Sequence, residues 1–151
     1  MYEYVIHKEF GHYKITSAGI LIFYAIRKNS LFGIDVYFYD ASNTLFATSK
    51  QNYFLFIDFG HSIKFIQNNY KCKLKGRGKS NILIYENNVY EMKYNLFNRK
   101  PELYKNEIIV GNCKTVFNTR DKYELIIACN ESKSCWIFSI MDVILDWFDV
   151  N

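Results

Sequence analysis

Short apolar runs recur along most of the chain, and turn-forming residues separate them at intervals of about 8–12 residues. The runs are rich in Ile, Val, Tyr and Phe, which are residue types that favour β-strands. This spacing is typical of an all-β protein. We expect thirteen strands, or twelve if one adjacent pair is a single bent strand. Their expected ranges are 2–9, 12–16, 20–27, 34–39, 44–49, 53–58, 62–67, 70–75, 81–86, 89–95, 107–111, 114–118 and 122–129.

Several runs carry apolar side chains at every second position, with Asp, Glu, Lys or Tyr between them, as in 34–39, 70–75 and 90–94. A period of two gives each strand one dry and one wet face, which suits an antiparallel sheet. Asn-rich segments separate neighbouring runs, and Asn tolerates the positive φ that tight hairpin turns require. These segments lie at 40–43, 68–69 and 87–88. The pattern therefore predicts a meander of neighbouring strands.

The segment 96–106 interrupts this rhythm, because it contains the sole proline, Pro101, and shows no alternation. Proline lacks the N–H that a central strand needs for its ladder. We expect a long surface loop here, with at most one helical turn.

The last part of the chain changes period. Twelve of the sixteen residues in 135–150 are apolar. The polar residues are Ser139, Asp142, Asp146 and Asp149. On an α-helix these four form one narrow stripe, so the rest of the surface must be enclosed. At about 1.5 Å per residue the helix is roughly 24 Å long, shorter than the ~30 Å core of a bilayer. We expect it inside the sheet, with Ser132 or Ser134 as its N-cap.

The amino-acid composition excludes several classes of protein. The chain has 151 residues, 50% hydrophobic and 19% aromatic, with one proline and seven glycines, which excludes a disordered or collagen-like chain. The net charge of +4 is too mild to demand a nucleic-acid partner. No zinc-finger spacing joins the four cysteines Cys72, Cys113, Cys129 and Cys135, and the first residues do not form a signal peptide. We expect free thiols and a cytoplasmic protein without a transmembrane segment.

The hairpin 34–48, with Asp40-Ala41-Ser42-Asn43 between its strands, and the ending Tyr123-Glu124-Leu125-Ile126-Ile127 followed by the apolar helix together carry a family resemblance. The chain resembles, over its whole length, the tubby-like C-terminal fold, and within it the LURP-one-related and phospholipid-scramblase-like branch. The resemblance implies a closed barrel of about twelve strands threaded by a hydrophobic helix. Members of that family are associated with phosphoinositide or phospholipid binding, or have no known function.

We therefore predict one domain, residues 1–151: an all-β fold with one helix, in which a closed antiparallel meander barrel surrounds the buried C-terminal helix. The competing architecture is a calycin barrel that carries a fatty ligand in its lumen. Lipocalins place a Gly-x-Trp near the first strand, whereas the two Trp residues here are Trp136 and Trp147. A helix in the lumen would leave no room for such a ligand.

The strongest candidate site is basic. Residues 63–80 contain six Lys or Arg and no Asp or Glu: Lys64, Lys71, Lys73, Lys75, Arg77 and Lys79. Alternation places Lys71, Lys73 and Lys75 on one strand face, and the glycines around Arg77 let backbone N–H groups approach an anion. This favours an anionic phospholipid headgroup or another phosphate as ligand. The same pattern is also compatible with a merely solvated strand face, since Lys protects sheet edges from aggregation.

Other clusters carry weaker signals. The stripe of Asp142, Asp146 and Asp149 has the spacing to bind a cation, but more simply faces solvent or a polar gap, where a basic strand residue pairs with one of them. His7 and His12 lie on adjacent expected strands, without a third metal ligand, and His61 stands alone. No Gly-x-Ser-x-Gly motif is present.

We accordingly expect neither a catalytic residue nor a cofactor or metal. The function that the sequence favours is a non-enzymatic binding module for anionic phospholipid or phosphate. The alternatives are a protein-interaction module, such as an immunity or adaptor protein that docks an acidic partner, and a lipid-carrying calycin.

Overall fold

The computed structural model describes residues 1–31, 33–54, 57–77, 80–95, 100–118 and 122–146. Twelve strands precede a single C-terminal helix. Their bounds are β1 Tyr2–Glu9, β2 His12–Ser17, β3 Ile20–Ser30, β4 Gly33–Asp40, β5 Leu45–Phe54, β6 Ile57–Phe65, β7 Tyr70–Arg77, β8 Ser80–Tyr85, β9 Asn88–Asn95, β10 Lys100–Lys105, β11 Ile108–Asn118, β12 Lys122–Cys129 and α1 Ser132–Leu145.

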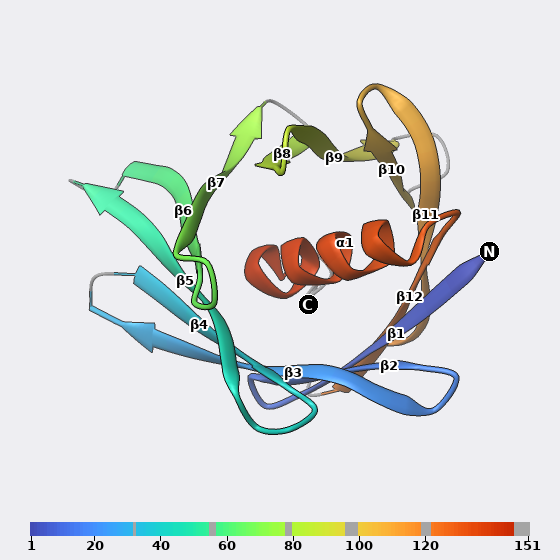
Figure 1. Ribbon diagram of the computed structural model, residues 1–151, viewed down its shortest axis with the longest axis horizontal. Coiled ribbons are helices and arrows are strands. Elements are labelled where there is room, and N and C mark those ends of the chain that lie inside the picture. Colours follow the sequence, from blue (N-terminus) through green and yellow to red (C-terminus); the bar gives the residue numbers. More distant parts are fainter. Residues whose placement is uncertain (32, 55–56, 78–79, 96–99, 119–121, 147–151) are drawn as a thin grey trace.

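The strands form one closed antiparallel barrel in which each pairs with its neighbours in sequence (Figure 1). The first strand closes the ring by pairing with the last, in a register that runs from Tyr2 opposite Cys129 to Glu9 opposite Lys122. Closure removes the sheet edges that would otherwise present unpaired backbone groups. The predicted meander barrel is confirmed.

The period of two in the sequence sets which side chains enter the barrel. In β4, Val36 and Phe38 are fully buried, and in β9 Tyr90 and Met92 are. Asn69 and Asn87, in the turns after β6 and β8, adopt positive φ values of 52° and 64°, as the turn chemistry predicts.

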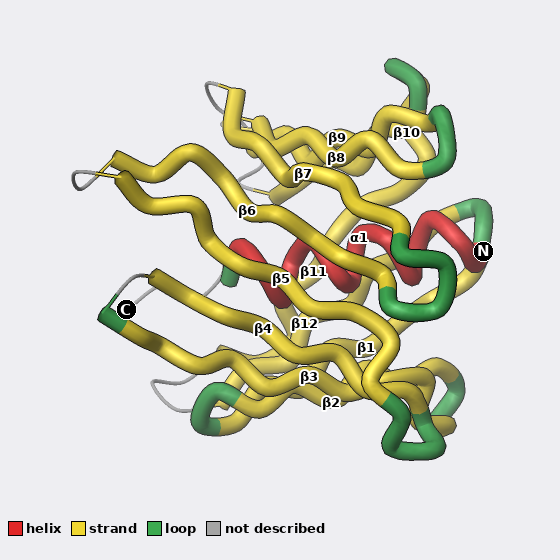
Figure 2. Tube along the Cα trace, turned by 60° about the vertical axis from the view of Figure 1, so that its left-hand side comes forward, coloured by secondary structure: helices red, strands yellow, loops and turns green. Residues whose placement is uncertain are grey.

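The helix α1 runs through the barrel from one mouth toward the other (Figures 1 and 2). Seven of its apolar side chains have no exposed surface: Cys135, Ile137, Phe138, Ile140, Met141, Val143 and Ile144. Because the helix and the inward side chains of the strands fill the interior, the lumen in which a calycin would carry its ligand is occupied. No described helix has the length and apolar character needed to cross a membrane.

The helix bounds differ from the expected 135–150. The helix begins at Ser132 and ends at Leu145, where Asp146 adopts a left-handed conformation with φ 50°, and residues 147–150 lie outside the described part. The N-cap residue is Glu131, which makes no side-chain cap hydrogen bond. The expectation of a serine cap was therefore wrong.

Three strand expectations also need correction. The segment 96–106 was expected to be a loop, but Lys100–Lys105 is strand β10, paired on both sides. The runs 107–111 and 114–118 are the single strand β11, bent by a register shift between Thr115 and Phe117. The expected run 53–58 instead spans the end of β5 and the start of β6. The total is twelve strands because the merged pair and the lost run 53–58 remove two expected strands and β10 adds one.

Candidate anion-binding face

Three of the predicted basic residues share the outer face of β7. Lys71, Lys73 and Lys75 are exposed, whereas Leu74 between them is buried inside the barrel and Cys72 is half-buried. The prediction that these three lysines lie on one strand face is confirmed.

Neighbouring strands widen this face. Lys64 on β6 lies directly opposite Lys71, and Ser62 lies opposite Lys73. On the other side of β6, Lys50 of β5 lies opposite the same Ser62. Lys50 and Lys64 are both exposed. We call Lys50, Lys64, Lys71, Lys73 and Lys75 the basic face.

Two residues of the predicted site, Arg77 and Lys79, lie partly or wholly outside the described part of the chain. Arg77 ends β7 with its backbone opposite Ser80, but its side chain is outside the described part. Lys79 lies outside the described residues altogether.

Sequence reasoning missed Lys50, because it lies 14 residues before Lys64 and outside the acid-free segment. The alternation around it carried a signal: Ala47 and Ser49 are buried, so Lys50 points outward. Only the register shows that it shares the face with Lys73.

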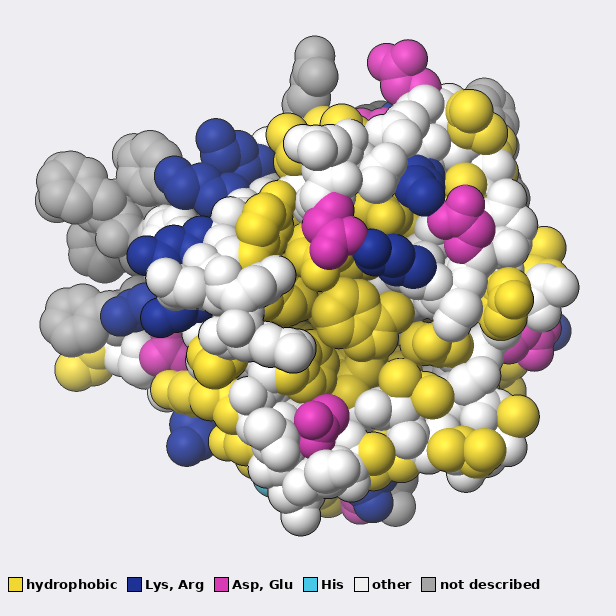
Figure 3. All heavy atoms as spheres, viewed as in Figure 1, with side chains coloured by type: hydrophobic (Ala, Val, Ile, Leu, Met, Phe, Trp, Pro, Cys, Tyr) yellow, Lys and Arg dark blue, Asp and Glu magenta, His cyan; other side chains and the backbone are white. Residues whose placement is uncertain are grey.

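The charges of the basic face stand close together, and Asp35 of β4 lies directly opposite one of them, Lys50. Residues directly opposite on antiparallel strands have Cβ atoms about 5 Å apart, and like charges in such a pair repel. Lys64 and Lys71 form such a pair. Within the described residues, none of the five lysines forms an ion pair with an acidic side chain. Figure 3 shows Lys and Arg side chains gathered on the left, over the strands that Figure 1 labels β5, β6 and β7.

The arrangement suits a broad anionic surface. Alternate residues on a strand lie about 6.6 Å apart and neighbouring strands about 4.8 Å, so the basic face extends roughly 13 Å along β7 and roughly 10 Å across the sheet. Each ammonium group is a strongly hydrated point charge with three donors. Lysines spread in this way can meet several phosphates side by side.

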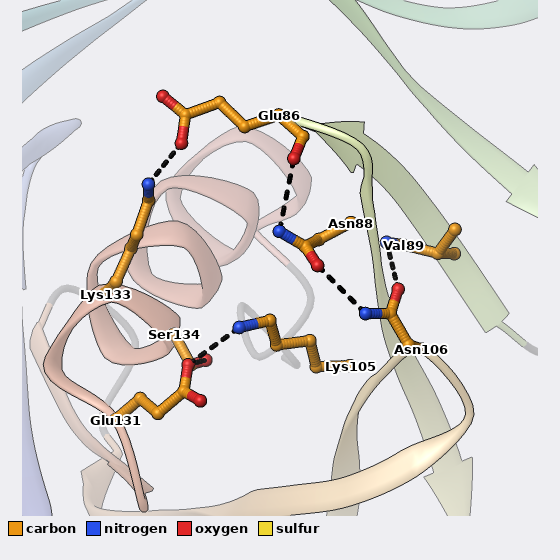
Figure 4. Close-up of polar contacts among 8 residues, drawn as sticks. All are labelled: Glu86, Asn88, Val89, Lys105, Asn106, Glu131, Lys133 and Ser134. Carbon is orange, nitrogen blue, oxygen red and sulfur yellow. Dashed lines mark hydrogen bonds and ion pairs between the residues drawn. The ribbon is translucent and has the colours of Figure 1, made fainter.

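Some cations elsewhere on the molecule have acidic partners, whereas the exposed Lys14, Lys28 and Lys114 form no ion pair within the described residues. Around the start of α1, Lys105 Nζ lies 2.8 Å from Glu131 Oε2, and Lys133 pairs with Glu86 (Figure 4). Glu131 also accepts a hydrogen bond from Ser134 Oγ at 3.3 Å. These contacts join the helix start to β10 and to the turn between β8 and β9.

Asp142 and Asp146 of the acidic stripe lie inside the barrel, whereas we expected the stripe to face solvent or a polar gap. Asp142 is fully buried and accepts a hydrogen bond from the Tyr123 hydroxyl at 3.2 Å. Burial, and then the neighbouring carboxylate of Asp146, raise the pKa of Asp142 to about 7. The stripe was placed at a solvated gap, and for Asp142 this was wrong, because the position lies deep in the helix interface.

Asp146 marks the other end of the helix. Its Oδ2 atom lies 2.6 Å from Lys8 Nζ and 3.0 Å from Arg27 Nη1, and the three side chains are only 11–13% exposed. The expected pairing of a basic strand residue with the stripe is confirmed. Asp149 lies outside the described residues.

The histidines do not converge. His7 lies opposite Lys14, not His12, and its Nδ1 is 3.1 Å from Glu124 Oε1. His12 lies opposite Glu9, and His61 is buried on β6. Within the part of the chain that the structure describes, no group of three or more His, Cys, Asp or Glu is placed to hold a metal ion.

The four cysteines are free, and three of them are buried. Burial raises the pKa of Cys72 to about 11 and that of Cys113 well above its ordinary value. Since the thiolate is the nucleophilic form, neither thiol is activated.

Comparison with known proteins identifies a shared fold. No family model and no curated protein sequence matches the chain. Its structure is similar to the X-ray structure of the protein AT5G01750 from Arabidopsis thaliana, with a TM-score of 0.57, covering 99% of this chain and 91% of that one. The sequences are 17% identical, so the similarity shows the fold alone. That protein is of the LURP-one-related type, which is compatible with the resemblance found in the sequence.

Proposed function

We propose that this protein is a non-enzymatic binding module whose basic face meets a surface of anionic phospholipid headgroups. The observation that carries the proposal is that exposed lysines from three adjacent strands share one face and form no ion pair among the described residues. Asp35, which lies opposite Lys50, stands at the β4 margin of this face. Elsewhere, the half-buried Lys105 and the exposed Lys133 each pair with a carboxylate. The exposed Lys14 and Lys114, which also lack an ion pair among the described residues, lie on separate strands, β2 and β11.

The dimensions of the basic face favour a surface over a single phosphate. A lone phosphate is held by donors that converge, whereas these lysines stand side by side on the outside of a sheet. Each Lys close to an anionic leaflet contributes about 1 kcal/mol. Five lysines acting together are enough for reversible attachment at moderate salt concentration.

Apolar side chains border the basic face. Lys75 lies opposite Ile82 of β8, and two residues further along the same strand Ile84 is 56% exposed. Val89, opposite Ile84 on β9, is 37% exposed. A cationic face with apolar side chains at its margin suits the headgroup region of a membrane. The proposal places the protein at the inner surface of a cellular membrane, where anionic lipids are concentrated.

Vesicle flotation tests the proposal. We expect the protein to float with phosphatidylcholine vesicles that contain phosphatidylserine or a phosphoinositide, and to remain unbound with phosphatidylcholine alone. Binding is expected to fall as salt concentration rises. Inorganic phosphate added as a competitor distinguishes the two sources of phosphate. It should release little protein from the vesicles if the basic face binds a lipid surface, and most of it if the basic face is a site for free phosphate.

A matched pair of double variants locates the site. Lys71→Glu with Lys73→Glu lowers the net charge by four and is expected to reduce vesicle affinity at least tenfold. Lys14→Glu with Lys114→Glu makes the same charge change at exposed positions on β2 and β11 and is expected to retain most of the binding. Equal losses in the two variants, or no vesicle binding by the wild-type protein, would overturn the proposal; the second result leaves an acidic protein partner as the remaining candidate.

A further inference from the structure

A hollow of about 480 Å³ opens at the barrel mouth where α1 begins. It is lined by Ile22, Phe23, Asp40, Phe46, Phe65, Gln67, Asn68, Tyr85 and Trp136. These residues come from the mouth-side parts of β3–β6 and β8, the turn between β6 and β7, and the first turns of the helix. Figure 3 faces this mouth and shows hydrophobic side chains forming a recessed floor, with charged side chains at its margin. The volume is that of a small-molecule site.

Aromatic rings form the floor of the hollow. The ring of Trp136 packs against Phe46 and Phe65, with ring centroids 5.7 and 5.8 Å apart, and against Tyr85 at 6.3 Å. Phe65 and Tyr85 are buried, whereas Trp136 and Phe46 are half-buried and reach the opening. The indole has the strongest negative face of the aromatic side chains, so it is the preferred partner for a cation.

One carboxylate stands at the rim. Among the described residues of the lining, Asp40 is the charged one, and its polar neighbours there, Gln67 and Asn68, are neutral. Asp40 Oδ1 accepts hydrogen bonds from the backbone N–H groups of Ser42 and Thr44 at 2.9 and 3.0 Å. These bonds fix the carboxylate in the turn after β4, so a negative charge is held in place beside the aromatic floor.

We propose that this hollow binds a small organic cation, an ammonium group that carries an apolar or aromatic substituent. The substituent would pack on Trp136 and Phe46, while the charge meets the face of the indole and the carboxylate of Asp40. No basic side chain is among the described lining residues; Lys133, whose Nζ lies 5.6 Å from the centre of the Tyr85 ring, pairs with Glu86. A fixed carboxylate beside an aromatic surface then selects against anions. This site is distinct from the basic face and carries the opposite charge preference.

Calorimetric titration with three soluble probes tests the inference. Benzyltrimethylammonium is expected to bind at least fivefold more tightly than benzyl alcohol, which lacks the charge, and benzoate is expected to bind least. If the cation does not bind, or if the three probes bind equally well, the inference is wrong.

Asp40→Asn tests the carboxylate. Asparagine keeps the oxygen that accepts from Ser42 and Thr44, so the turn is preserved while the charge is lost. We expect affinity for benzyltrimethylammonium to fall at least fivefold, with benzyl alcohol binding unchanged. Asp35→Asn, on the outer wall of β4, is the matched control and should retain wild-type affinity.

A second variant covers the case in which Asp40→Asn does not fold. Phe46→Leu removes one ring from the floor while keeping an apolar side chain, and affinity for the cation is expected to fall about threefold or more. Wild-type affinity in a folded Asp40→Asn protein, or in Phe46→Leu, would contradict the proposed site.

Discussion

Charged side chains inside this barrel have partners of opposite charge or hydrogen-bond donors, whereas lysines on its outer basic face lie beside one another. Inside, the carboxylates in α1 and at its C-cap have partners: Asp146 meets Lys8 and Arg27, and Asp142 accepts from the Tyr123 hydroxyl. Outside, the lysines of the basic face lie beside one another, with Lys64 directly opposite Lys71. Partnered charges on the inside serve the fold, because a buried ion without a partner is costly. Charges left without partners on the outside lower stability slightly and remain available for a ligand.

Removal of α1 is expected to have the largest effect on stability. Deleting residues 132–151 takes away the side chains that fill the lumen, and each large buried side chain lost costs about 2–5 kcal/mol. The total exceeds the stability of an ordinary domain, so the truncated chain should not fold. Circular dichroism during heating should show no cooperative transition. A soluble truncation that melts cooperatively would contradict the role given to α1.

A single substitution tests the charge cluster at the helix end. Asp146→Ala removes the carboxylate that lies between the nearly buried Lys8 and Arg27, and is expected to lower the free energy of unfolding by about 3 kcal/mol. Urea denaturation measures this. Lys133→Ala, which breaks the exposed pair with Glu86, is the control, and its effect on stability should be too small to measure. Similar losses of stability in both variants would contradict the distinction between the nearly buried charge cluster and the exposed ion pair.

Asp142 should make stability depend on pH. Its pKa is raised to about 7 in the folded protein, against about 3.9 in an unfolded chain. The folded state therefore holds a proton that the unfolded chain releases, so the stabilising effect is complete below pH ~4 and lost as pH rises through ~7. Between about pH 5 and pH 7, the free energy of unfolding is expected to fall by about 2 kcal/mol.

The variant Asp142→Asn isolates that effect. We expect its unfolding free energy to depend less on pH between about 4 and 7 than that of the wild-type protein. Denaturation at a series of pH values compares the two. Parallel pH profiles would show that another group is responsible.

The smallest stability effect is expected on the outside, and with the opposite sign. Lys71→Glu turns a repulsive cross-strand pair with Lys64 into an attractive one, so stability should rise by up to about 1 kcal/mol. Urea denaturation at low salt concentration is the appropriate measurement, since salt screens the pair. A clear loss of stability would show that Lys71 has a structural partner.

Local patterns in the sequence predict much of this fold. The period of two marks Val36, Phe38 and Leu74 as inward residues, and the run of apolar residues near the end predicts an enclosed helix. Asn69 and Asn87 mark turns because their backbones adopt positive φ. Each of these signals lies within a few residues of the structure that it predicts.

Features that depend on distant partners were not predictable. Strand β10 contains Pro101, and its alternation is limited to the buried Pro101 and Leu103. It forms because β9 and β11 each need a neighbour for the ring to close, and β10 pairs with both. Lys50 joins the basic face only through the register of β5 with β6. The partners of Asp146 come from β1 and β3, more than a hundred residues away in sequence.

The central claim is that the basic face acts as a three-dimensional surface built from three strands, and Lys50 tests this most directly. Reversing one charge near an anionic leaflet costs about 2 kcal/mol, so Lys50→Glu should weaken binding to phosphatidylserine-containing vesicles by about tenfold or more. Lys114→Glu, an equal change at an exposed position on β11, should bind as the wild-type protein does. Wild-type binding by Lys50→Glu, or an equal loss in Lys114→Glu, would contradict the account.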